Sequence, residues 1–119
     1  MIDICVDEAY AFDYYAIMEL KFQKGAIPEF LLKKIKYKIT KQLGVELFQT
    51  ILESSEYKKL YEANSNTFDA VDKAKTNQVT AQEVDRTNYE RMMAKKALQS
   101  KFFENVLSEQ KIGYEKYEK

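Results

Sequence analysis

Four carboxylate side chains within the first twenty residues are the strongest candidate for chemistry in this sequence. They lie in a stretch that is apolar on most sides, where a carboxylate must form an ion pair, bind a metal ion or take up a proton. At 100° per residue, Glu8 and Glu19 project within about 20° of each other on a helix. This candidate acidic cluster consists of Asp7, Glu8, Asp13 and Glu19.

Three interpretations of the acidic cluster are open. The one we favour pairs the acids with the lysines that follow in the chain, across a helical hairpin, and leaves some acids exposed. The second is an acidic surface for a partner protein. The third is a divalent-metal site in a metal-dependent all-α hydrolase, although the Glu-Glu-x-x-Glu and Glu-x-x-Asp pattern typical of such enzymes is missing. We therefore assign no catalytic residue, metal ligand or cofactor.

A group of lysines around one tyrosine is the second candidate. Such a face could hold a phosphate backbone and stack a base, or it could bind an acidic partner protein. It contains no arginine, the residue best suited to bidentate phosphate and guanine contacts, so any nucleic-acid binding would be weak and nonspecific. A solvated helix face with internal salt bridges is the third alternative. The candidate interaction face consists of Lys33, Lys34, Tyr37, Lys38 and Lys41.

The composition of the 119 residues excludes several classes of site. Histidine is absent, which removes the commonest general base and metal ligand and excludes Ser-His-Asp and Cys-His arrangements. Glycine-rich phosphate loops, Cys-x-x-Cys pairs and EF-hand loops are also missing. Cys5 is the only cysteine, and we expect it to be a small, buried apolar residue. These exclusions favour a binding protein over an enzyme.

Apolar periodicity predicts four helices in one domain that spans residues 1–119. One proline and three glycines are too few for the turns of a many-stranded β fold. The first helix is expected over residues 3–24 and the second over 28–53, where Gly44 could kink or end it. Because the first is apolar nearly all round, we expect it in the middle of the structure or in an interface.

The second half of the chain predicts the other two helices. The third is expected over residues 55–76, although residues 64–67 are poor helix formers that could break it. A capping box at Thr80–Glu83 begins the fourth, which we expect to run to about residue 110, with a frayed tail over 111–119. A helix of about 30 residues is roughly 45 Å long and would extend beyond a compact domain of this size, so we expect a homodimer.

The charges occur in blocks that cancel. Residues 1–20 carry a net charge of −5, residues 21–41 +6, residues 42–72 −4 and residues 73–119 +3. Neighbouring helices therefore attract, which favours an antiparallel bundle of about four helices with one long C-terminal helix. Neither a secretory signal nor an apolar run long enough to cross a bilayer is present. We expect a small cytoplasmic accessory or adaptor protein that acts by protein–protein interaction and self-associates.

Overall fold

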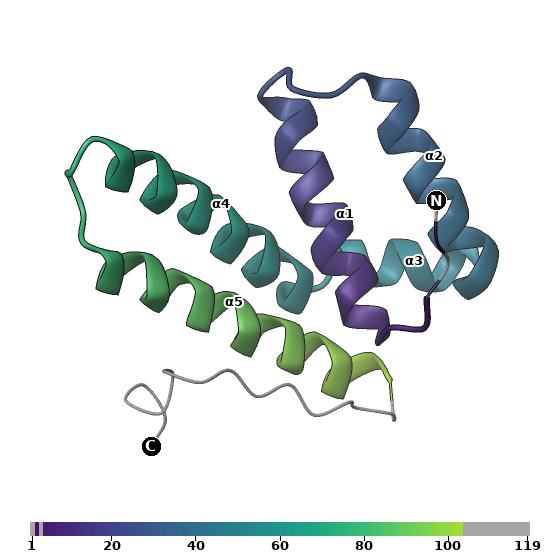
Figure 1. Cartoon of the computed structure of the whole chain (residues 1–119). Coiled ribbons are helices and arrows are strands. Elements are labelled where there is room, and N and C mark those ends of the chain that lie inside the picture. The colour runs from purple at the N-terminus through teal and green to yellow at the C-terminus, as the bar shows by residue number, and fades with distance from the viewer. Residues whose placement is uncertain (1, 3, 104–119) are drawn as a thin grey trace.

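The computed structural model describes residues 2 and 4–103, and the backbone there is all-α, as predicted (Figure 1). Five helices follow one another along this part of the chain, one more than expected. They are α1 (Glu8–Gln23), α2 (Glu29–Leu43), α3 (Val45–Leu52), α4 (Ser55–Lys75) and α5 (Ala81–Phe102). Within the described ranges there is no strand, and no helix is long and apolar enough to cross a membrane.

The helix predicted over residues 28–53 is divided into α2 and α3 at Gly44, the residue at which the sequence allowed a kink or an end. Gly44 has φ +91°, a backbone conformation that side-chain-bearing L-residues rarely adopt. Its N–H closes the last turn of α2 on the Thr40 carbonyl, and its own carbonyl accepts the Phe48 N–H of α3. The break lets α3 change direction and bring Phe48 and Ile51 into the core, where both are fully buried.

Helix α4 continues through residues 64–67 because its polar side chains are satisfied there. Asn64 Nδ2 donates to the Leu60 carbonyl at 3.1 Å, and Thr67 Oγ1 donates to the Ala63 carbonyl at 2.9 Å. Asn64 is also anchored from outside the helix by the Asp13 carboxylate. Tertiary contacts thus override a weak helix propensity.

The start of α5 agrees with the prediction, whereas the start of α1 does not. The capping prediction for the last helix is confirmed, since Thr80 Oγ1 accepts the Glu83 N–H at 3.2 Å. The first helix begins at Glu8, five residues later than predicted, after an extended segment. At its C-terminal end, α5 ends at Phe102, because the backbone of Phe103 is extended (φ −135°, ψ 148°). The rest of the predicted helix, residues 104–110, and the predicted tail over residues 111–119 lie outside the described residues.

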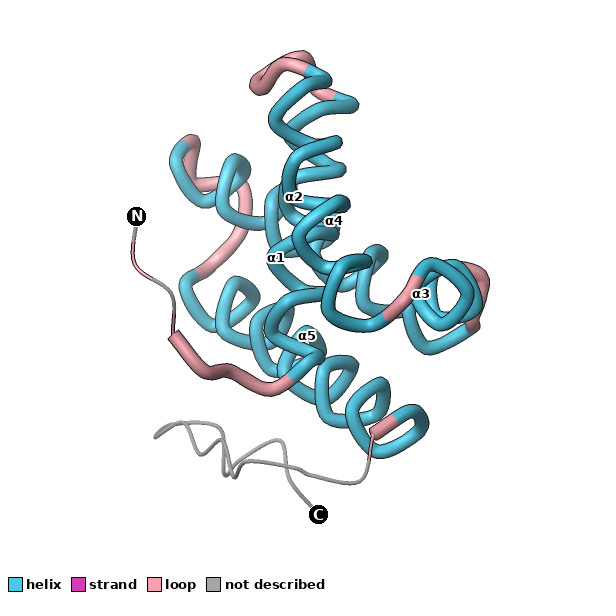
Figure 2. The backbone as a smooth tube through the Cα atoms, turned by 90° about the vertical axis from the view of Figure 1, so that its right-hand side faces the viewer, coloured by secondary structure: helices cyan, strands magenta, loops and turns pink. Residues whose placement is uncertain are grey.

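Helix α1 lies centrally, between the antiparallel α4–α5 hairpin and α2 (Figure 1). The view from the side shows α3 at one edge of the molecule, joined by short loops to α2 and α4 (Figure 2). The prediction of a central first helix is therefore confirmed. Its Phe12 is fully buried and stacks on Phe48, with ring centroids 5.6 Å apart, while Leu60 of α4 and Leu98 of α5 complete the core.

The lengths of α4 and α5 change the argument for a dimer. The two helices have 21 and 22 residues, about 32 and 33 Å, and they pair with each other side by side (Figure 1). The described part of the C-terminal helix therefore has a partner of equal length in the same chain. A second copy needs a different reason, namely a surface that fits it.

Candidate interaction surface

Asp13 of the acidic cluster is buried at the junction of α1, α4 and α5. Its carboxylate accepts hydrogen bonds from Arg91 Nε at 3.0 Å and Arg91 Nη2 at 2.8 Å, which is a bidentate ion pair. Asn64 Nδ2 donates a third hydrogen bond to it at 2.9 Å. The favoured interpretation placed the partner in the lysine block, whereas Asp13 pairs with α5, 78 residues away in sequence. We call the side chains of Asp13, Asn64 and Arg91 the polar seam.

Glu8 takes part in a separate contact between the start of α1 and α5. Gln99 Nε2 donates to Glu8 Oε1 at 2.9 Å, and Gln99 Oε1 accepts the backbone N–H of Ala9 at 2.8 Å. Gln99 is almost fully buried, so it satisfies an N–H in the first turn of α1 that has no partner within the helix. Glu8 therefore serves to join two helices.

Glu19 lies among three tyrosines near the other end of α1. Tyr57 OH donates to Glu19 Oε1 at 2.8 Å. Burial of the hydroxyl, and then the charge of Glu19, raise the pKa of Tyr57 far above its usual value near 10. The same two causes, in the same order, raise the pKa of Tyr15 and of Tyr61. Of the three tyrosines, Tyr57 is the one that hydrogen-bonds Glu19.

The four predicted acids are thus not brought together. Asp7 is the N-cap residue of α1, and Glu8, Asp13 and Glu19 hydrogen-bond to different side chains of α4 and α5. In the part of the chain that the structure describes, no three His, Cys, Asp or Glu side chains are grouped so that they could hold a metal ion. The described residues therefore give no metal-binding geometry for the hydrolase interpretation.

Arg91 is the residue that sequence reasoning missed. It projects about 140° from Arg86, the only other arginine, so the two form no common stripe, and Arg91 carried no signal as part of an arginine surface. A different signal was available: the chain has only two arginines, and a bidentate guanidinium is the usual partner of a buried carboxylate.

The candidate interaction face lies on α2, a helix without a single buried residue. All five of its members are exposed: Lys33, Lys34, Tyr37, Lys38 and Lys41. Lys33 Nζ forms an ion pair with Glu29 Oε1 at 2.8 Å, one helical turn away, which raises the pKa of Lys33 and lowers that of Glu29 through the hydrogen bond and the charge. One member of the face is therefore engaged within its own helix.

Lys34 and Lys38 instead flank an apolar hollow between α1 and α2. The hollow has a volume of about 280 Å³. Its α2 wall is a ladder at every fourth residue, and its α1 wall is formed by one small and one aromatic side chain. The lining residues are Ile2, Ala11, Tyr14, Leu31, Lys34, Ile35, Lys38 and Ile39.

A second hollow of about 310 Å³ continues this groove toward the start of α1, because both are lined by Ala11 and Ile39. The extended segment before α1 forms one side of it and includes Cys5. The prediction of a buried Cys5 is wrong: its thiol is exposed, since residue 5 precedes the helix that was expected to bury it. Together the two hollows form what we call the α1–α2 groove.

Large apolar side chains are unusually exposed along this groove. Ile2 is 88% exposed, Ile4 73% and Tyr14 48%. A monomer seldom leaves several such side chains in water at one place unless that place binds something. The alternation Ile2, Ile4, Val6 was the available sequence signal for an extended segment here.

Comparison with protein-family models, with curated proteins and with solved structures found no match for this chain. The geometry of the α1–α2 groove and of the α4–α5 hairpin therefore carries the functional argument alone.

Proposed function

We propose that this chain is a protein-interaction module, of accessory or adaptor type, that binds an acidic amphipathic helix of a partner in the α1–α2 groove. One observation carries the proposal. Lys34 and Lys38 flank the same hollow whose wall is formed by Ile35 and Ile39. Apolar area and positive charge thus occur together on one surface.

The mode of binding follows from helix-in-groove recognition. A partner helix with apolar side chains at i, i+3 or i+4 and i+7 would bury them against Leu31, Ile35 and Ile39. Acidic side chains along its edges would then meet Lys34 and Lys38. Such charges steer the encounter and select the partner, so binding should weaken as the salt concentration rises.

Peptide binding tests this proposal. The probe is a fluorescently labelled amphipathic helical peptide with glutamates on its polar face, compared with the same peptide carrying glutamines there and with a single-stranded oligonucleotide. We expect the acidic peptide to bind at least tenfold more tightly than the glutamine peptide. Ile35→Asp, or Lys34→Glu with Lys38→Glu, should weaken its binding at least tenfold.

A matched charge reversal elsewhere is the control. Lys73→Glu with Lys75→Glu changes the net charge equally at exposed positions on α4 and should leave peptide affinity within twofold. Circular dichroism confirms the helical content of each variant. Equal binding of the two peptides contradicts the proposal, and tighter binding of the oligonucleotide would favour the nucleic-acid alternative.

We also propose that the chain self-associates, because a second open groove lies on the α4–α5 hairpin. Sedimentation equilibrium from micromolar to hundreds of micromolar protein tests this part separately. We expect a dimer of the 14.0 kDa chain within this range, whereas a species that stays at 14.0 kDa throughout contradicts it.

A further inference from the structure

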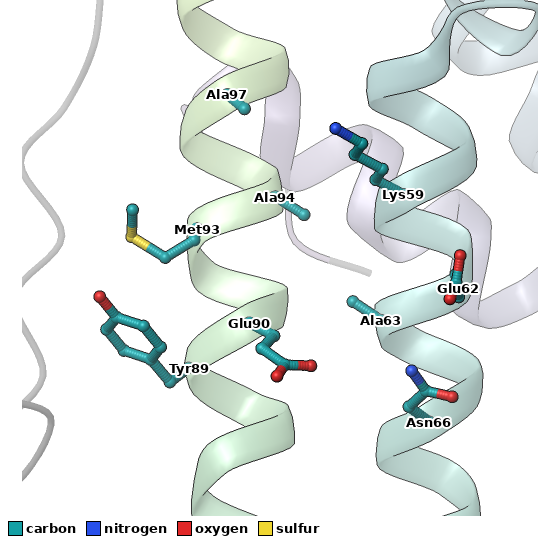
Figure 3. A pocket seen from close by; sticks show the side chains of 9 residues that line it. All are labelled: Lys59, Glu62, Ala63, Asn66, Tyr89, Glu90, Met93, Ala94 and Ala97. Carbon is teal, nitrogen blue, oxygen red and sulfur yellow. The ribbon is translucent and has the colours of Figure 1, made fainter. Parts of the chain in front are cut away.

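A groove of about 500 Å³ runs between α4 and α5 on the hairpin surface (Figure 3). Its floor is made of small side chains from both helices: Ala63, Ala94 and Ala97. Met93 of α5 stands at its edge and is 44% exposed. The side chains that hold the hairpin against α1, such as Asn64, Arg91 and Gln99, do not line this groove.

The two ends of the groove differ in charge and in size. Lys59 and Ala97 lie at one end, whereas Tyr89 and Glu90 lie at the other (Figure 3). Lys59 extends from α4 and Glu90 from α5, and both reach toward the midline between the helices. One end is thus positive and small, and the opposite end is negative and large.

We infer that a second copy of this chain packs face to face on this groove. The two copies are related by a two-fold axis that lies in the plane of contact and crosses the two helices at right angles. Such an axis passes at the level of Ala63 and Met93 and exchanges the two ends. Lys59 of each copy then meets Glu90 of the other, and Tyr89 fills the space above Ala97.

The opposite charges and the opposite side-chain sizes at the two ends of the groove both favour a second copy as its occupant. In an isologous dimer one patch must be complementary to itself, so its charge and its relief must reverse across the axis. This groove does both, with a cation opposite an anion and a tyrosine opposite an alanine. The inference rests on the self-association part of the proposed function and adds the face and the direction of the axis.

One side chain opposes this arrangement and can be used to test it. Glu62 of α4 lines the groove near the level of the axis, where the two copies bring their Glu62 carboxylates toward each other. Like charges close together are unfavourable. Glu62→Gln should therefore lower the dimer dissociation constant severalfold.

Disulfide trapping between single-cysteine variants tests the direction of the axis. In a Cys5→Ser background, Lys59→Cys and Glu90→Cys are prepared separately, mixed and mildly oxidised. We expect a linked dimer on a non-reducing gel from the mixture and none from either variant alone, because a disulfide needs Cβ atoms about 3.8 Å apart. A linked dimer from Lys59→Cys alone would show an axis parallel to the helices and overturn the inference.

Sedimentation of groove variants separates this inference from self-association itself. Met93→Glu should raise the dimer dissociation constant at least tenfold. Val71→Glu is an equally drastic change at an exposed position of α4 outside the groove, and it should leave the constant within twofold. If the wild-type chain dimerises, but Met93→Glu leaves the dimer affinity unchanged and no cross-link forms, the proposed face is wrong and self-association still holds. A wild-type monomer overturns both. If the chain stays monomeric and Met93→Glu lowers its folding stability, the chain's own residues cover the groove. This result also overturns the inference.

Discussion

The polar seam and helix α2 place charged side chains in opposite settings. In the seam, Asp13 is 4% exposed and is bound by side chains from two other helices. On α2 no residue is buried, and Lys34 and Lys38 stand in water beside an apolar hollow. Charges that find a complement inside the chain hold it together, and the exposed charges beside apolar area are the ones that the proposed partner would meet.

The seam also fixes how the helices are aligned. Asp13 of α1 meets Asn64 of α4 and Arg91 of α5, so sliding α4 or α5 by a turn would remove some of the donors from a buried carboxylate, and sliding α1 would remove all three hydrogen bonds. A buried polar contact of this kind penalises other registers more than it adds to stability. On α2 the apolar ladder supplies the contact with α1, and its lysines set no register.

The largest effect that separates the two regions should come from Arg91→Ala. Removing the guanidinium leaves the Asp13 carboxylate buried with only Asn64 as a side-chain donor, and breaking a buried ion pair in this way costs about 3–5 kcal/mol. The Arg91 side chain is 26% exposed, so we expect the lower end, about 3 kcal/mol. Urea unfolding at neutral pH measures the loss.

Arg86→Ala is the matched control for that prediction. Arg86 lies on the same helix, its side chain is 52% exposed, and its Nε is 3.9 Å from Glu83 one turn away. An exposed pair of this kind contributes little, so the free energy of unfolding should change by less than about 1 kcal/mol. Equal losses in the two variants would mean that burial does not distinguish the seam from the surface.

The core of the fold was largely readable from the sequence, and the seam was not. Apolar periodicity predicted the all-α class and the central first helix, and Thr80–Glu83 predicted where α5 begins. These are local signals, since they depend on spacing within one helix. The pairing of Asp13 with Arg91 depends on three helices meeting, which no spacing within one helix encodes.

The candidate surface was readable only in part. The five members of the candidate interaction face are exposed on α2, while their role in binding stays a prediction. The hollow beside them was missed because its walls come from two helices and from Ile2, and spacing within one helix does not show which elements meet. Gly44 stood out in the sequence as the place of a kink or an end, but the sequence did not decide between the two, because the residues after it also favour a helix.

An intermediate effect is expected at alkaline pH from Tyr57. Its raised pKa means that the folded chain keeps the phenol proton when the unfolded chain, with a pKa near 10, loses it. This contribution to stability is complete below about pH 10 and is lost as the pH rises further. In Tyr57→Phe the decline of unfolding free energy above pH 10 should be shallower by about 1.4 kcal/mol per pH unit.

Urea unfolding at several pH values between 9 and 11.5 measures that slope. Tyr37→Phe, at an exposed ring on α2, is the control and should keep the wild-type slope. A Tyr57→Phe variant with the wild-type slope would show that the buried hydroxyl near Glu19 does not resist ionisation.

The smallest effect on stability should come from the α2 lysines, where the largest effect on binding is expected. Lys34→Gln with Lys38→Gln removes two exposed charges, and surface changes of this kind shift the free energy of unfolding by about 0.5 kcal/mol or less. The same variant should bind the acidic peptide severalfold more weakly, because it removes the two lysine charges that the proposed recognition uses. A loss of more than about 1 kcal/mol in urea unfolding would show that these lysines support the fold. The surface would then resemble the seam, and the contrast that assigns α2 to a partner would disappear.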